Sequence, residues 1–121
     1  MEICIVDDDK VYQLLMKKII KKIDPSISIK AFYNGEDAYE YYKKTRCDCH
    51  VLLLDINMPQ MDGWEFLKRL NDEQIEISQI YLATSSIAYS DIEKAKEYKS
   101  VKGYLTKPIT KDKIIEITQQ S

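Results

Sequence analysis

The sequence predicts an α/β fold in which five parallel strands form one sheet and helices cover both of its faces. Short apolar runs alternate with longer amphipathic stretches along the 121 residues, and this alternation is typical of strands joined by crossover helices. The runs at 50–55 and 79–84 are almost continuously apolar, as expected of parallel strands buried on both faces. We therefore expect a doubly wound sheet.

The expected strands follow these runs, at 2–6, 26–32, 50–55, 79–84 and 101–106. The chain length suits a single domain with one core of useful size. We expect one domain over residues 1–121 and no output domain within this chain. The last predicted helix looks short at Gln120 and Ser121, which leaves open that the chain was trimmed from a longer protein.

The first predicted helix follows Asp9, whose carboxylate suits an N-terminal cap, and ends before Pro25. The apolar residues that recur every four positions, and that we expect to form its buried stripe, are Val11, Leu15, Ile19 and Ile23. A second helix is predicted after Asn34 and Gly35, with acids in its first turn and basic residues in its last.

Apolar spacing and capping residues predict three further helices. The third should bury Phe66, Leu67 and Leu70 and pair Glu65 with Arg69. The fourth should open with the capping-box pattern "SDIE" at 90–93. The residues of this helix expected to face inward are Ile92, Ala95 and Tyr98. Because they are few, we expect it to be the most loosely packed helix. The fifth is expected to use Thr110 as its cap and to bury Ile114 and Ile117.

Composition narrows the possible partners and locations. A net charge of -2 gives no general attraction to nucleic acid, so we expect no direct nucleic-acid binding. The sequence has no apolar run of about eighteen residues, so no contact with a membrane is expected. The acidic start "MEICIVDDDK" is unlike a secretory signal, and we expect a cytoplasmic protein.

The three cysteines cannot all pair with one another. Cys4 lies in an apolar run and is expected to behave as a small hydrophobic residue. The stretch "CDCH" at 47–50 contains zinc-type ligands, but the rest of the chain offers too few others for the usual two-cluster site. We interpret it as a loop that leads into the next strand.

Polar residues follow four of the predicted strands. Asp7, Asp8 and Asp9 follow the first, Asp55 ends the third, Thr84 ends the fourth and Lys107 follows the fifth. The carboxyl ends of parallel strands meet at one edge of a sheet, where ligands usually bind. Crowded carboxylates raise one another's proton affinity unless a cation is present, and an open site of oxygen ligands suits Mg²⁺.

A carboxylate beside Mg²⁺ and a lysine is an activated phosphoryl acceptor, because both cations stabilise charge on the transferring oxygens. Ordinary structural roles remain open for the same residues. Asp9 is better interpreted as a helix cap. The simpler interpretation of Lys107 is a surface ion pair. The stretch "NMPQMDG" at 57–63 also suits a turn.

At this point the sequence closely resembles the receiver domain of two-component response regulators. The motifs that match in order and spacing are "IVDDD" at 5–9, "LLLDINMPQMDG" at 52–63, "LATS" at 82–85 and "GYLTKP" at 103–108. Four motifs in register are far more specific than any one of them. The resemblance implies a flavodoxin-like sheet with strand order 2-1-3-4-5, five helices, and a phosphoprotein that acts in phosphorelay signal transduction.

The resemblance also implies roles for individual residues. Asp55 would accept phosphate from a phosphohistidine of a sensor histidine kinase or histidine phosphotransfer protein. Mg²⁺ would be held by the side chains of Asp8 and Asp55 and the carbonyl of Asn57, with Asp7 acting mainly through water. Lys107 would contact the phosphoryl group.

Other matches concern the response to phosphate. Thr84 would close onto the phosphoryl group through its hydroxyl, and Tyr104 would turn inward as a switch residue. The resemblance implies a cis Lys107–Pro108 peptide bond. It also assigns Asn57 and Ser86 to positions that tune hydrolysis of the acyl phosphate. The surface expected to bind a downstream protein spans the fourth helix, fifth strand and fifth helix and includes Lys94, Tyr98, Lys102 and Tyr104. An ordinary solvated face explains the two lysines and Tyr98 equally well.

Three alternatives remain at this stage. A pseudo-receiver would bind partners without phosphate, although the chain keeps candidates for every acid and for the lysine. A phosphatase of the haloacid dehalogenase type would also use an aspartate nucleophile, but it needs a general acid where this chain has Asn57. A nucleotide or flavin protein would need a glycine-rich phosphate loop, and the three glycines here are not clustered.

Overall fold

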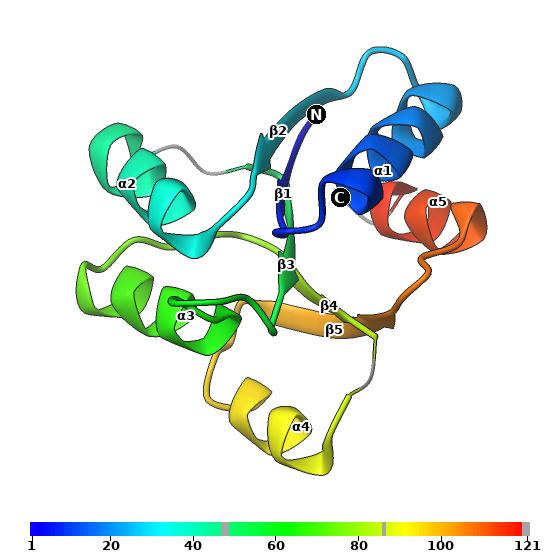
Figure 1. The fold of residues 1–121 in the computed structure, drawn as a ribbon. Helices are drawn as coiled ribbons and strands as arrows, with labels where there is room; N and C mark the ends of the chain where they lie inside the picture. The colour runs from blue at the N-terminus through cyan, green and yellow to red at the C-terminus, as the bar shows by residue number, and fades with distance from the viewer. Residues whose placement is uncertain (47–48, 86, 120–121) are drawn as a thin grey trace.

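The computed structural model describes residues 1–46, 49–85 and 87–119 and shows a central parallel sheet between two layers of helices (Figure 1). The strand order is β2-β1-β3-β4-β5, which confirms the expected topology. The strands are β1 (Glu2–Val6), β2 (Ser28–Phe32), β3 (Val51–Asp55), β4 (Ile80–Thr84) and β5 (Val101–Thr106). β3 is the middle strand, and it and its neighbours β1 and β4 are covered on both faces.

The helices are α1 (Lys10–Ile23), α2 (Gly35–Thr45), α3 (Gly63–Asp72), α4 (Tyr89–Ala95) and α5 (Lys111–Gln119). α1 and α5 cover one face of the sheet, and α2, α3 and α4 cover the other (Figure 1). Each face has its own apolar core. In the described part of the chain, no helix is long and apolar enough to cross a membrane.

Several local predictions are confirmed. Asp9 caps α1, because its Oδ1 accepts from the backbone amides of Val11 and Tyr12 at 3.0 and 3.1 Å. Thr110 accepts from the amide of Lys113 at the start of α5. The remaining confirmed features are the Glu65–Arg69 ion pair at 3.9 Å, the buried Phe66, Leu67, Leu70, Ile114 and Ile117, and the cis Lys107–Pro108 bond. The Asn34 side chain, to which the sequence assigned no role, caps α2 by accepting from the backbone amide of Asp37.

The buried stripe predicted for α1 is only half right, because Ile19 and Ile23 are half-buried against the core whereas Val11 and Leu15 are exposed. Val11 and Leu15 are 77% and 51% exposed, while the fully buried residues of the helix are Gln13, Met16 and Ile20. A helix turns about 100° per residue, so side chains four positions apart drift by about 40° at each step. A row of four such residues therefore cannot keep all its members on the buried face of the helix. In α1 that face follows Gln13, Met16 and Ile20.

The predicted start of α4 is also wrong. The N-cap is Ala88 and not Ser90, and the carboxylate of Asp91 accepts from the Ala88 amide at 3.2 Å. Asp91 also contacts α3, because Nε1 of Trp64 in that helix donates to the other carboxylate oxygen of Asp91 at 3.1 Å. Only Ala95 of this short helix is fully buried, and Tyr98 lies beyond its end. The loose packing of α4 agrees with the sequence, but its cap depends on a tertiary contact.

The environment of Cys4 differs from our expectation. Its sulfur is bonded to that of Cys49, with the two Cα atoms 6.2 Å apart, and neither residue is exposed. The sequence led us to expect an unpaired thiol there. Cys49 lies in the segment that leads into β3, as we expected. Cys47 and Asp48 of the same stretch lie outside the described residues.

Gly63 packs directly beneath the last residue of β3. A Cβ atom at this position would lie 2.7 Å from the carbonyl oxygen of Asp55 and 2.9 Å from the Cα of Ile56, and both are backbone atoms. The turn that follows β3 therefore needs a residue without a side chain at its end. The same close approach holds the start of α3 against the strand that carries Asp55.

We expect Gly63→Ala to lower the free energy of unfolding by about 1–3 kcal/mol, because the backbone near Asp55 must shift to admit the methyl group. Urea denaturation measures the change. The matched control is Gly103→Ala, where the added Cβ would meet only the Tyr81 ring at an ordinary 3.4 Å. Equal stability of the two variants would show that this turn adapts freely.

Candidate functional site

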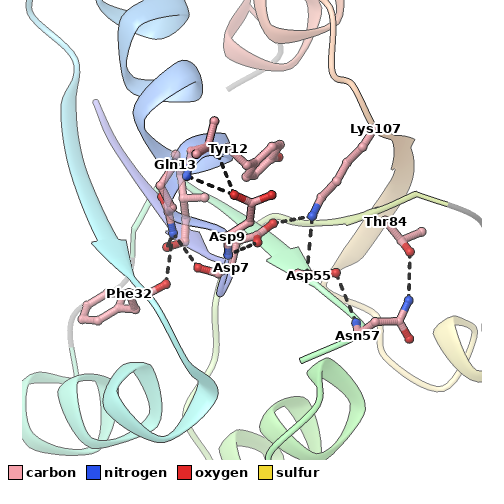
Figure 2. A network of polar contacts seen from close by, with 11 residues as sticks. Asp7, Asp9, Tyr12, Gln13, Phe32, Asp55, Asn57, Thr84 and Lys107 are labelled. Atoms are coloured by element: carbon pink, nitrogen blue, oxygen red, sulfur yellow. Dashed lines mark hydrogen bonds and ion pairs between the residues drawn. The ribbon is translucent and has the colours of Figure 1, made fainter. Parts of the chain in front are cut away.

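The register of the sheet brings the ends of four strands to one edge. Val6 pairs with Leu54, Asp55 with Ala83, and Thr84 with Thr106. The residues that follow or end these strands are Asp7, Asp55, Thr84 and Lys107, and Figure 2 shows their side chains converging above the sheet. The predicted convergence at the carboxyl ends is confirmed.

Three carboxylates form the centre of the site. Asp7, Asp8 and Asp55 each supply an oxygen, and these oxygens lie within 4.8 Å of one another. Asp7 and Asp55 are buried, with 1% and 5% exposure, whereas Asp8 is exposed. Asp9 turns away to cap α1. Two buried carboxylates and one open to solvent are a donor set of hard oxygen ligands that fits Mg²⁺, which keeps part of its water shell.

Lys107 reaches the same carboxylates from the end of β5 (Figure 2). Its Nζ lies 2.5 Å from Asp7 Oδ2 and 3.5 Å from Asp55 Oδ2. The ammonium partly offsets the negative charge of the cluster, and its side chain is only 20% exposed. The lysine is therefore an integral part of the cluster, which rules out the simpler interpretation as a surface ion pair.

The carboxyl groups of Asp55 and Asp7 bind protons more tightly than usual. Burial, together with the charge of Asp7, raises the pKa of Asp55 to about 6, although Lys107 and the Asn57 amide act in the opposite direction. Burial also raises the pKa of Asp7. The cluster therefore carries uncompensated negative charge near neutral pH, as expected of a site that holds a cation.

This proton affinity predicts a pH-dependent effect of Asp55→Asn on the stability of the metal-free protein. The folded pKa is raised above the ordinary value of 3.8, so the stabilisation is present below that value and is lost as pH rises through about 6. The amide of the variant cannot ionise and avoids the loss. We expect the variant to gain about 2 kcal/mol over wild type between about pH 4 and about pH 7.5, measured by urea denaturation with a metal chelator. A constant difference across this range would contradict the assigned proton affinity.

The loop after β3 links Asp55 to Thr84. The backbone amide of Asn57 donates to Asp55 Oδ1 at 3.1 Å, and its side-chain Nδ2 donates to Thr84 Oγ1 at 3.1 Å. Thr84 is buried, and Asn57 is exposed. The structure thus brings both predicted residues to the carboxylate cluster, as Figure 2 shows.

Tyr104 lies apart from the cluster. It is half-buried against the core under α4, and its hydroxyl donates to the carbonyl of Ile92 at 3.4 Å. Tyr104 pairs in register with Leu82, two residues before Thr84 on the neighbouring strand. Its side chain therefore contacts α4 and not the carboxylates. Ser86, which the resemblance assigned to hydrolysis, lies outside the described residues.

Gln13 supports the site and was missed in the sequence. Its Nε2 donates to the carbonyls of Ile5, Asp7 and Phe32 at 3.0 to 3.2 Å, and the residue is fully buried (Figure 2). These bonds tie the ends of β1 and β2 to α1 just below the carboxylates. Gln13 shares a buried helix face with Met16. A polar residue on an otherwise apolar face is the sequence feature that could have indicated its supporting role.

The comparisons with known proteins agree with this geometry. The family model for the response regulator receiver domain matches residues 3–119. The chemotaxis protein CheY of Listeria monocytogenes is 26% identical over 121 residues, which cover the whole chain and 98% of the relative. The crystal structure of a two-component response regulator from Legionella pneumophila superposes with a TM-score of 0.87 at 26% identity, covering 99% of this chain and 96% of that one.

The chain belongs to the response regulator receiver domain family. The 3',5'-cyclic-nucleotide phosphodiesterase regA of Dictyostelium discoideum is 30% identical over 114 residues, which are 91% of this chain and 14% of the relative. The chain therefore spans only a small part of that relative but nearly the full length of the Listeria CheY.

Proposed function

We propose that the protein is a phosphoacceptor receiver that takes a phosphoryl group onto Asp55 and switches a protein-binding surface. The observation that supports this most directly is the position of the Asp55 carboxylate at the end of β3, with two further carboxylates within 4.8 Å and the Lys107 ammonium at 3.5 Å. A nucleophile, a cation site and a fixed positive charge are the parts that phosphoryl transfer requires. The proposal treats residues 1–121 as one receiver domain.

In the proposed reaction, an oxygen of Asp55 attacks the phosphorus of a phosphohistidine in line with the leaving nitrogen. The P–N bond breaks, an acyl phosphate forms, and the departing imidazole nitrogen keeps the electron pair and takes a proton from solvent. Lys107 balances charge on the phosphoryl oxygens. Water later attacks the phosphorus and returns the free carboxylate and inorganic phosphate. The donor protein would be a histidine kinase or a histidine phosphotransfer protein.

The metal in this proposal is Mg²⁺. Asp8 and Asp55 would hold it through their side chains and Asn57 through its backbone carbonyl, while buried Asp7 would act mainly through water. Bound Mg²⁺ supplies electrostatic stabilisation of the transferring phosphoryl oxygens. Within the chain itself, Asp7 fixes the Lys107 ammonium and the Asn57 amide orients Asp55.

The phosphoryl group would add one to two negative charges beside Thr84. The Thr84 hydroxyl would then donate to a phosphoryl oxygen and give up its contact with Asn57 Nδ2. We propose that this movement frees space for Tyr104 and releases its bond to Ile92 in α4. Such a change shifts the population of α4 conformations only as far as phosphate favours one of them.

The surface expected to bind the downstream protein is formed by α4, β5 and α5. Lys94 and Lys102 are exposed, and Tyr98 and Tyr104 are half-buried along its edge. A second surface suits the phosphate donor: Val11, Leu14 and Leu15 of α1 are 77%, 56% and 51% exposed just beyond Asp9. Exposed apolar groups next to a reactive centre commonly mark protein contacts. The cytoplasmic location stays a prediction.

Trp64, the single tryptophan, offers a readout of this switch because its indole donates to Asp91 in α4. We expect a phosphate mimic with Mg²⁺ to change its fluorescence in wild type. In Thr84→Ala the change should be much smaller even though the mimic still binds, because no hydroxyl remains to follow it. Full fluorescence response in the alanine variant would remove Thr84 from the switch, and Thr106→Ala on the exposed end of β5 is the control.

The proposed function is tested by phosphoryl transfer from labelled acetyl phosphate, and separately from a phosphorylated histidine protein, in the presence of Mg²⁺. The expected product is an acyl phosphate on this chain that hydroxylamine cleaves. A chain that takes no label from either donor would instead act as a pseudo-receiver. Steady turnover of small phosphomonoesters would favour the phosphatase alternative.

A further inference from the structure

The aromatic ring of Tyr12 lies against the lysine of the site. Lys107 Nζ is 4.4 Å from the ring centroid, which is within the range of a cation–π interaction. Tyr12 stands in the first turn of α1, where its backbone amide donates to the Asp9 cap. Figure 2 shows it on the α1 side of Asp7, beside the carboxylates. The sequence assigned no role to this residue.

The hydroxyl group of Tyr12 does not explain its position. It is buried and has no hydrogen-bond partner among the described residues, which normally costs stability. Burial and the charges of Asp7 and Asp55 raise the pKa of this hydroxyl, so the ring stays neutral. The face of the ring is therefore the part of Tyr12 that interacts with the site.

Among the described residues, the other partners of the Lys107 ammonium are Asp7 and Asp55, whose carboxylates have further roles in the proposed function. Mg²⁺ and the phosphoryl group would draw on the oxygens of these same carboxylates. The ring is a neutral partner that attracts the ammonium through its quadrupole and occupies no carboxylate oxygen. It can therefore support Lys107 while the carboxylates change their partners.

We propose that Tyr12 is a positioning residue that holds the Lys107 ammonium beside Asp55 for phosphoryl transfer. This inference rests on the proposed function. Tyr12 acts through Lys107 and not on the phosphoryl group, so its contribution depends on the lysine. A purely structural role, in which Tyr12 only packs against the core between α1 and the sheet, would not depend on it.

A double-mutant cycle separates the two roles. The rate of phosphorylation by acetyl phosphate at saturating Mg²⁺ is measured for wild type, Tyr12→Leu, Lys107→Ala and the double variant. We expect Tyr12→Leu to lower the rate about threefold to tenfold when Lys107 is present, as the strength of cation–π contacts suggests, and to have no further effect in Lys107→Ala. Tyr12→Phe, which keeps the ring, should restore most of the rate lost in Tyr12→Leu.

Ile19→Ala, a half-buried position of the same helix and core, controls for lost packing and should leave the rate unchanged. An equal loss from Tyr12→Leu with and without Lys107, or no loss at all, would overturn the positioning role while leaving the proposed function intact. Failure of wild type to take any label would instead overturn the proposed function and the role of Tyr12 with it.

Discussion

Asp55→Asn is expected to abolish phosphorylation by acetyl phosphate and by a phosphohistidine donor. The electron pair on the amide nitrogen of asparagine is delocalised into the carbonyl group, and the amide oxygen carries no full negative charge, so the acyl phosphate cannot form. The effect should be a loss of all label and not a slower rate, because no neighbouring carboxylate shares the position of Asp55: Asp7 is bound to Lys107, and Asp8 is open to solvent. Labelling followed by intact-mass measurement gives the result.

The matched control is Asp72→Asn, which makes the same chemical change at the exposed end of α3. It should take label like wild type. Folding of Asp55→Asn is not expected to confuse the result, because loss of a buried charge from the metal-free site should stabilise the chain at neutral pH. Label on Asp55→Asn equal to that of wild type would mean that another group accepts the phosphate.

Removal of the metal, or of the exposed carboxylate expected to bind it, should have the second largest effect. A bound metal contributes several kcal/mol to stabilising a phosphoryl transition state, and each 1.4 kcal/mol or so is a factor of ten in rate. We therefore expect chelation of Mg²⁺ to slow phosphorylation by about a hundredfold or more. Asp8→Asn should weaken Mg²⁺ binding, measured by calorimetry, by at least about tenfold.

The neighbouring residue supplies the control for this prediction. Asp9→Asn removes the same charge one position away, and asparagine caps helices as well as aspartate does, so α1 should be preserved. Mg²⁺ affinity in this variant should stay close to that of wild type. Equal weakening in both variants would show that Mg²⁺ responds to total charge and not to Asp8 as a ligand.

The sequence predicted where the polar side chains of the site meet because each of them ends or follows a strand. Once β1, β3, β4 and β5 are parallel, the residues that follow them must meet at one edge, whatever the details of the helices. The positions of Asp7, Asp55, Thr84 and Lys107 follow from this topology alone. The roles of these residues with phosphate and metal are still predictions.

The features that the sequence did not predict are those set by contacts between distant elements. The buried face of α1 includes Gln13, because three carbonyls at the ends of β1 and β2 accept from its amide, and a polar residue on that face hides the apolar pattern. The cap of α4 depends on Asp91 and on Trp64 from another helix. Cys4 meets a sulfur 45 positions away, at a distance that no local pattern encodes.

The central claim is that one carboxylate, Asp55, receives the phosphate, and chemical trapping tests it most directly. Borohydride reduces an aspartyl phosphate to homoserine, and sequencing of the reduced peptides by mass spectrometry then locates the modified residue. After treatment with acetyl phosphate and Mg²⁺, homoserine should appear at position 55. Homoserine at position 7 or 8, or label that resists hydroxylamine and borohydride, would contradict the account.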